Sequence, residues 1–116
     1  MIENDFSGGR AYAQSKLAQV FHTLDLAEEL DGKEVLVTSL HPATMMPTGM
    51  VLRSGRPPRA TIDEGATAVM QLVRSDDIES GSFYRGLQRS RAHDQAYDRE
   101  ARAKLKALAE ELTGIR

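Results

Sequence analysis

The feature that most constrains the fold is a short apolar run that stands between two helical patterns. The residues Val-Leu-Val-Thr occupy positions 35–38, and Pro42 follows shortly after and ends the run, because proline cannot donate a hydrogen bond to a sheet. An apolar run of this length without alternation is typical of a strand that is covered on both faces. We therefore predict a short buried strand over Glu34–Leu40.

Helical periodicity lies on both sides of this strand. Apolar residues recur at helical spacing from Arg10 to Leu30, and this pattern stops at the turn pair Asp31-Gly32. A second helix is predicted from the capping-box pattern at Thr61 and Glu64 to about Ser75. Its apolar face is formed by Ile62, Ala66, Val69, Met70 and Val73.

The last third of the chain gives weaker signals. Phe83 and Tyr84 lie between glycines and indicate a short strand over Ser80–Gly86. A charged helix follows and ends before Gly114, with one apolar face formed by Tyr97, Ala101, Leu105, Leu108 and Leu112. We interpret the charged residues from Asp94 to Glu111 as a solvated helix face and assign no chemistry to them.

The order of these elements predicts an α/β fold. Helix, strand, loop, helix, strand and helix imply a right-handed crossover between two parallel strands, which is a piece of a doubly wound sheet. Two strands are too few to cover Val35 and Val37 on both faces. We therefore expect residues 1–116 to form a single partial domain, and further strands to be supplied from outside this sequence.

Composition excludes several classes of protein. The 116 residues contain no cysteine, carry a formal net charge of −2 with both signs interleaved, and hold no apolar run of membrane-spanning length. We therefore expect neither nucleic-acid nor membrane partners. We expect a cytoplasmic location. The three histidines, His22, His41 and His93, lack metal-ligand spacing, so we predict no metal site.

The chemistry begins with a tyrosine and a lysine four residues apart in the first helix. Tyr12 and Lys16 share one helical face, where their side chains can meet in one site. A free tyrosine titrates near a pKa of about 10, and a neighbouring ammonium favours the phenolate, so such a pair suits acid and base catalysis. The alternative is that Tyr12 only begins a helix and that Lys16 is solvated.

The segment Arg10–Gln19, RAYAQSKLAQ, resembles the active-site helix of the short-chain dehydrogenase/reductase family. In that family the helix leads to a strand that ends in Pro-Gly, and then to a threonine-bearing loop, a helix and a short strand. This sequence has the same order, with His41-Pro42-Ala43 at the Pro-Gly step, and the resemblance covers residues 6–87. It implies the C-terminal part of a Rossmann fold, whose first helix commonly forms a homo-oligomer interface.

The resemblance also implies an NAD(P)-dependent oxidoreductase that transfers hydride at a carbonyl or secondary alcohol. Tyr12 would exchange a proton with the substrate oxygen, and Lys16 would hold the nicotinamide ribose. The backbone after the proline would lie against the nicotinamide carboxamide, and a loop hydroxyl would touch the diphosphate; the residues concerned are Pro42, Ala43, Thr44, Met45 and Thr48. Thr48 could instead be an ordinary loop threonine. The nearby methionines could line a substrate pocket or pack structurally.

The sequence departs from the family in two ways. Ala43 replaces the usual glycine, and Pro47 lies near the usual threonine, which leaves the register of the loop open. The sequence contains no strand that leads through a glycine-rich turn into a helix, which is the motif that binds a pyrophosphate. Gly8-Gly9 precedes the first helix and is interpreted as a turn. We expect the dinucleotide-binding half and the substrate-polarising serine to lie upstream of Met1, and residues 1–116 alone to be inactive. A non-catalytic, truncated chain that acts as an interaction partner is the alternative.

Overall fold

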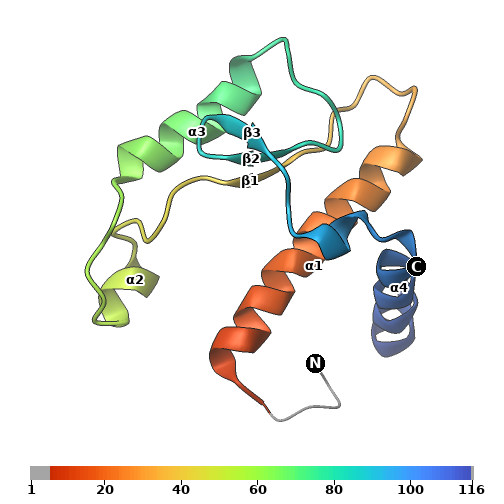
Figure 1. Ribbon diagram of the computed structural model, residues 1–116, viewed down its shortest axis with the longest axis horizontal. Helices are drawn as coiled ribbons and strands as arrows, with labels where there is room; N and C mark the ends of the chain where they lie inside the picture. The colour runs from red at the N-terminus through yellow and green to blue at the C-terminus, as the bar shows by residue number, and fades with distance from the viewer. Residues whose placement is uncertain (1–5, 116) are drawn as a thin grey trace.

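The computed structural model describes residues 6–115 as an α/β unit with one small sheet (Figure 1). Its elements in chain order are α1 (Gly8–Glu29), β1 (Ser39–His41), α2 (Gly49–Arg53), α3 (Ile62–Arg74), β2 (Phe83–Arg85), β3 (Gln88–Ser90), the 3-10 helix η1 (Asp94–Tyr97) and α4 (Arg99–Thr113).

The long first helix is confirmed, with both of its ends specified locally. Ser7 is the N-cap, and its hydroxyl oxygen accepts a hydrogen bond from the Arg10 N–H at 3.4 Å. Gly8 and Gly9 form the first turn of the helix, in place of the turn expected before it. At the other end Gly32 has a φ of 78°, which a residue with a side chain rarely adopts, and this lets the chain reverse toward β1.

The predicted pair of parallel strands is confirmed, but the sheet differs from expectation in extent. β1 pairs with β2 in parallel, and β2 pairs with β3 in antiparallel orientation. The third strand was not predicted; the two-residue turn before it contains Gly86, whose φ is 60°.

The first strand is shorter than the predicted span Glu34–Leu40 and begins only at Ser39. Val35 and Leu36, which we expected to be buried, are 49% and 61% exposed. Their exposure has a simple cause. Within residues 6–115 only β2 pairs with β1, so no strand lies on its other edge to extend the ladder and cover this segment.

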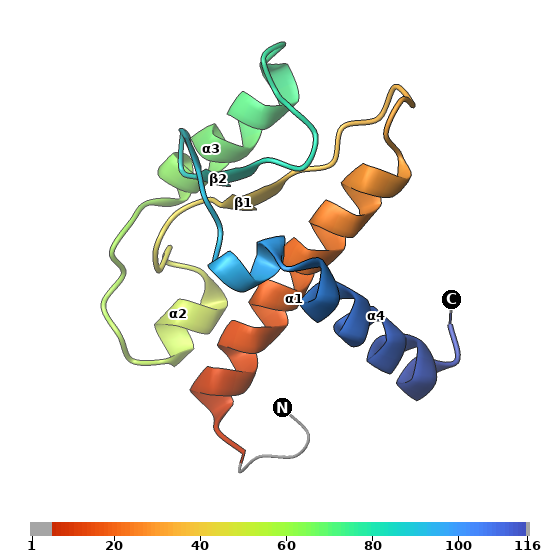
Figure 2. The ribbon, with the colours of Figure 1, turned by 45° about the vertical axis from the view of Figure 1, so that its right-hand side comes forward.

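The helices α1 and α3 lie on opposite sides of the strands (Figures 1 and 2). The capping box that begins α3 is confirmed, since Thr61 and Glu64 exchange side-chain and backbone hydrogen bonds. The predicted apolar face of α3 is wrong, because all five of its residues are exposed, Val73 at 70%. The residues that α3 buries are Gly65 and Ala68, which lie outside that predicted face.

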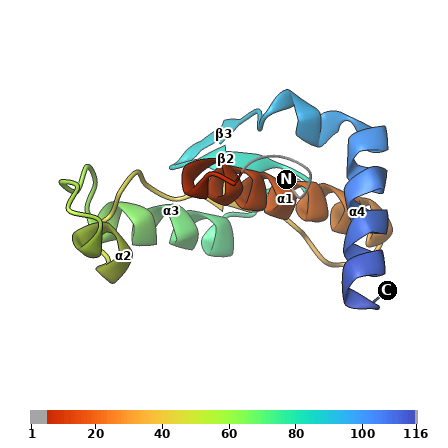
Figure 3. The same ribbon diagram turned by 90° about the horizontal axis from the view of Figure 1, so that it is seen from below.

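The last helix packs beside the C-terminal half of α1 (Figure 3). Arg102 of α4 is only 5% exposed and makes its bonds to residues far from it in the sequence. Its guanidinium donates to Asp25 at 2.7 Å and to Glu28 at 2.9 Å, both on α1, and to the Ala96 carbonyl at 2.7 Å. The interpretation of this charged segment as wholly solvated was therefore wrong at Arg102.

The chain leaves more surface open than a compact protein of its size. Its accessible surface is 8893 Å², whereas a folded monomer of this mass exposes about 6300 Å². Its radius of gyration is 15.9 Å, against about 13 Å for a compact domain of this length. Among the helices in residues 6–115, none has the length and apolar character needed to span a membrane.

Candidate functional site

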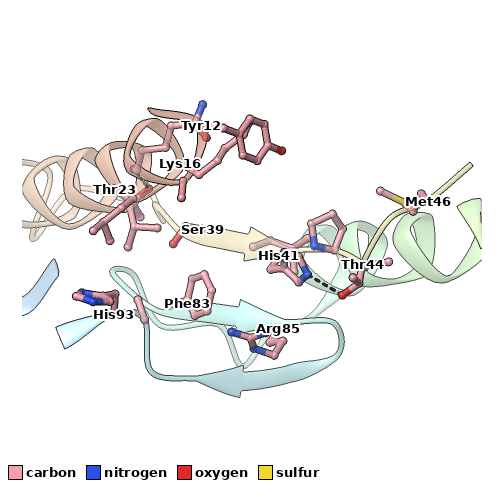
Figure 4. Close-up of a pocket in the computed structure, with 18 of the residues that line it drawn as sticks. Tyr12, Lys16, Thr23, Ser39, His41, Thr44, Met46, Phe83, Arg85 and His93 are labelled. Atoms are coloured by element: carbon pink, nitrogen blue, oxygen red, sulfur yellow. Dashed lines mark hydrogen bonds between the residues drawn. The ribbon is translucent and has the colours of Figure 1, made fainter. Parts of the chain in front are cut away.

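A pocket of about 940 Å³ lies between α1 and the end of the sheet toward which the parallel strands run. Its lining comes from residues 12–23 of α1, from Thr38, β1 and the residues after it as far as Val51, from β2, and from residues 91–93. Figure 4 shows these parts around one space, with α1 on one side and the two parallel strands on the other. Ligands of α/β sheets bind at this end of the strands.

Tyr12 and Lys16 line this pocket together. The Lys16 Nζ lies 5.5 Å from the centroid of the Tyr12 ring, and the tyrosine side chain is 52% exposed. The predicted sharing of one helical face is thus confirmed in geometry (Figure 4). Ser15, between them, donates its hydroxyl to the Tyr12 carbonyl at 2.7 Å and does not line the pocket. The catalytic roles of Tyr12 and Lys16 remain predictions.

The loop after β1 brings the other predicted residues to the same pocket. Pro42, Ala43, Thr44, Met45 and Thr48 all line it. The Thr44 hydroxyl lies 3.2 Å from the His41 Nε2, a hydrogen bond within this loop. Met45 has a φ of 51°, which is uncommon outside glycine, and its carbonyl accepts from the Arg59 N–H at 3.0 Å. The backbone here is held in a defined, bent path.

The segment between β1 and α3, which the sequence predicted as a loop, contains the short helix α2. Thr48 is its N-cap residue, yet the hydroxyl makes no capping hydrogen bond. The Thr48 side chain is therefore left available to a ligand. Met46, which also lines the pocket, anchors the loop to α3, because its sulfur lies so close to Gly65 that a side chain at Gly65 would collide with it.

The sheet face that floors the pocket was not predicted from sequence. Parallel pairing puts Ser39 opposite Phe83 and His41 opposite Arg85, and all four residues line the pocket. Tyr84, the residue between, is buried and lines no part of it. Alternation along the strand could have predicted that Tyr84 lies on the opposite face of the sheet from Phe83 and Arg85. The pairing of Arg85 with His41 depends on the register between distant segments.

Residues 91–93 close the pocket on the side of the C-terminal helices and were also missed. The Arg91 guanidinium lies 4.0 Å from the Tyr97 ring centroid and pairs with Asp94 at 3.2 Å. The His93 Nδ1 accepts a hydrogen bond from the Gln95 N–H at 3.2 Å, which caps η1. In the part of the chain that the structure describes, no three acidic, histidine or cysteine side chains gather as a metal site would require.

Three polar groups meet in the pocket: the Tyr12 phenol, the Lys16 ammonium and the Thr48 hydroxyl, beside the bent backbone at Met45. A glycine-rich turn that could hold a pyrophosphate is not found among the described residues. Within residues 6–115 no glycine-rich turn links a strand to a following helix, because the glycine pair at positions 8 and 9 belongs to α1 itself.

Comparison with known proteins gives one distant similarity. The chain is 28% identical to human retinol dehydrogenase 12 over 124 aligned positions, which take in 98% of this chain and 39% of that protein. The chain thus spans about two fifths of the length of the relative it matches. No family model and no solved structure matches the sequence. The similarity supports a relation to the short-chain dehydrogenase/reductase family, and so to oxidoreductases.

Proposed function

We propose that the chain carries the catalytic residues of an NAD(P)-dependent oxidoreductase that acts at a carbonyl or secondary alcohol of a small molecule. One observation carries the proposal. Tyr12 and Lys16, together with the five residues chosen on the same resemblance from the loop after β1, line a single pocket. The similarity to a dehydrogenase over nearly the whole chain adds support.

Tyr12 is the proton-transfer residue in this proposal. In the direction of alcohol oxidation, the Tyr12 phenolate accepts the proton of the substrate hydroxyl while the C–H bond at that carbon breaks; in reduction, the phenol donates the proton to the carbonyl oxygen. The Lys16 Nζ lies 5.5 Å from the centroid of this ring and lines the same pocket.

The nicotinamide, when bound, supplies or accepts the hydride. Lys16 would hold the ribose hydroxyls, and the backbone at Pro42–Met45 would lie against the carboxamide. The Thr48 hydroxyl, which makes no capping hydrogen bond, would bind the diphosphate. Each of these roles follows from the family resemblance and from the position of the residue in the pocket lining.

The dinucleotide-binding half is proposed to come from a segment outside these 116 residues. The chain matches 39% of its relative, and it leaves Val35 and Leu36 exposed beside a strand with one open edge. A further parallel strand on that edge would cover both side chains and extend the sheet.

Transfer of deuterium tests this function. The native polypeptide that carries the sequence, purified from its source cells, is incubated with NADH or NADPH deuterated at C4 and a panel of aldehydes and ketones. We expect deuterium at the carbinol carbon of the product with one of the two cofactors. The proposal is wrong if that polypeptide binds either cofactor and transfers no deuterium to any substrate of the panel.

A second candidate function rests on the exposed apolar surface. Val69 and Val73 of α3 are exposed together with Val35 and Leu36, and such side chains favour contact with another chain. In this alternative the chain is a non-catalytic partner in an assembly, with a homo-oligomer through α1 as the first arrangement to test. The intact mass of the native polypeptide separates the two: 12.8 kDa favours the partner, and a mass of about twice that favours the enzyme.

A further inference from the structure

The sheet face beneath α1 carries charge where packing alone would favour apolar side chains. A parallel sheet under a helix is normally covered by Val, Ile and Leu. Here the last residues of the two parallel strands are His41 and Arg85, which are register partners, and both line the pocket. Their positions beneath Tyr12 and Lys16 are visible in Figure 4.

The pocket as a whole is basic. The described residues that line it include Lys16, Arg85 and Arg91 together with His41 and His93, and they include no aspartate or glutamate. A site with several cations and no carboxylate attracts anions and disfavours cations, because each positive charge adds to the same local potential.

Arg85 is the cation that is free to meet a ligand. Arg91 already pairs with Asp94 and stacks on Tyr97. Lys16 lies beside the Tyr12 ring. Arg85 is exposed at the end of β2, and no carboxylate of residues 6–115 lies within ion-pair distance of it. A guanidinium presents a planar fork that matches a carboxylate or a phosphate.

His93 can contribute a second donor. Its Nδ1 accepts a hydrogen bond from the Gln95 N–H, so in the neutral ring the proton is on Nε2, and that N–H remains for the pocket. Figure 4 shows His93 and Phe83 at one end of the space and Met46 at the other. The lining at the methionine end includes four apolar side chains, Met45, Met46, Met50 and Val51, beside the hydroxyls of Thr44 and Thr48.

We propose that this pocket selects a substrate that is an organic anion with an apolar body. Its carboxylate or phosphate head pairs with Arg85, its hydrocarbon portion lies along the methionine wall, and the carbonyl or hydroxyl to be converted lies near Tyr12. The inference rests on the proposed function, since it names the substrate class of the same site.

Binding of simple probes tests the inference without catalysis. The native polypeptide that carries the sequence is titrated calorimetrically, without added cofactor, with octanoate, octyl phosphate and the neutral control 1-octanol. We expect at least one of the two anions to bind about tenfold or more tightly than octanol, because a charge-assisted hydrogen bond to a guanidinium is added. The better anion identifies the head group.

Two arginine variants of one hairpin provide the matched comparison. Arg85→Gln should abolish the preference for the anion. Arg89→Gln should keep it, because Arg89 lies outside the pocket lining and pairs with Glu79 at 2.9 Å. Equal binding of anion and octanol, no binding of either anion, or equal loss in both variants would overturn the inference.

An ADP titration separates substrate from cofactor. If ADP competes with octanoate and also loses affinity in Arg85→Gln, the arginine serves a cofactor phosphate, and the inference about the substrate fails. The proposed function has its own readout: native polypeptide that transfers deuterium to neutral ketones but not to oxo acids would retain the function while refuting the substrate class.

Discussion

The helices α3 and α4 reach their places by opposite means. Both are capped and amphipathic, but α3 has the stronger apolar face, and much of that face is exposed, with Val73 at 70%. α4 has the more polar sequence, and its most buried residue is an arginine, Arg102, at 5%. The residues that α3 buries are small, Gly65 and Ala68, whereas the residue that α4 buries is charged, and the apolar face of α4 is also partly exposed, with Leu112 at 63%.

The contrast shows what each helix has available to pack against. α4 meets two carboxylates, Asp25 and Glu28, that α1 presents on one side, so its arginine is fully paired on burial. α3 meets a sheet of three short strands, which is too small to cover its whole apolar face. Burial follows the partner surface and is not set by the composition of the helix alone.

The largest effect on stability is expected at Arg102, whose ion pairs join α4 to α1. Arg102→Met removes the bonds to Asp25, Glu28 and the buried Ala96 carbonyl, and we expect the free energy of unfolding to fall by about 2–3 kcal/mol. This is below the cost at a fully buried pair, because the Asp25 and Glu28 side chains are 28% and 50% exposed. Urea denaturation measures the change.

Arg99→Met is the matched control for that variant. The Arg99 side chain is 81% exposed and pairs only with Glu28, at 3.4 Å. We expect a loss of no more than about 0.5 kcal/mol. If the two variants lose equal stability, Arg102 is not the residue that holds α4 on α1.

The smallest effect is expected on the apolar face of α3. Val73→Lys places a charge on a side chain that is 70% exposed, and we expect a change in unfolding free energy within about 0.5 kcal/mol for the isolated chain. The melting temperature of the 116-residue chain reports it. A loss several times larger would mean that this face is covered in solution, and the contrast between the two helices would disappear.

Local patterns predicted the three long helices, α1, α3 and α4, and the motif residues of the site, but not α2 or η1. The ends of α1 and α3 follow from Ser7 and from the Thr61–Glu64 box, each of which acts within one turn. Tyr12 and Lys16 share a face because four residues separate them. The loop after Pro42 lies at the same end of the sheet as the end of β2, because parallel strands run in one direction and their C-terminal ends lie together.

The parts that were missed depend on distant partners. The burial of Arg102 requires Asp25, 77 residues away in the sequence. The pairing of Arg85 with His41 requires the register of two strands that two helices, α2 and α3, and their connecting loops separate. The exposure of Val35 depends on a strand edge that stays open in this chain. None of these distant relations has a signature at helical or strand spacing.

The central claim is that the pocket containing Tyr12 is the site of an oxidoreductase, and the most direct test is Tyr12→Phe in the native polypeptide. The control is Tyr84→Phe, at a buried tyrosine of β2 that lies outside the pocket. We expect turnover to fall about a hundredfold or more in Tyr12→Phe with cofactor affinity unchanged, because only the proton-transfer group is lost. We expect Tyr84→Phe to retain turnover. Undiminished turnover in Tyr12→Phe would contradict the assignment.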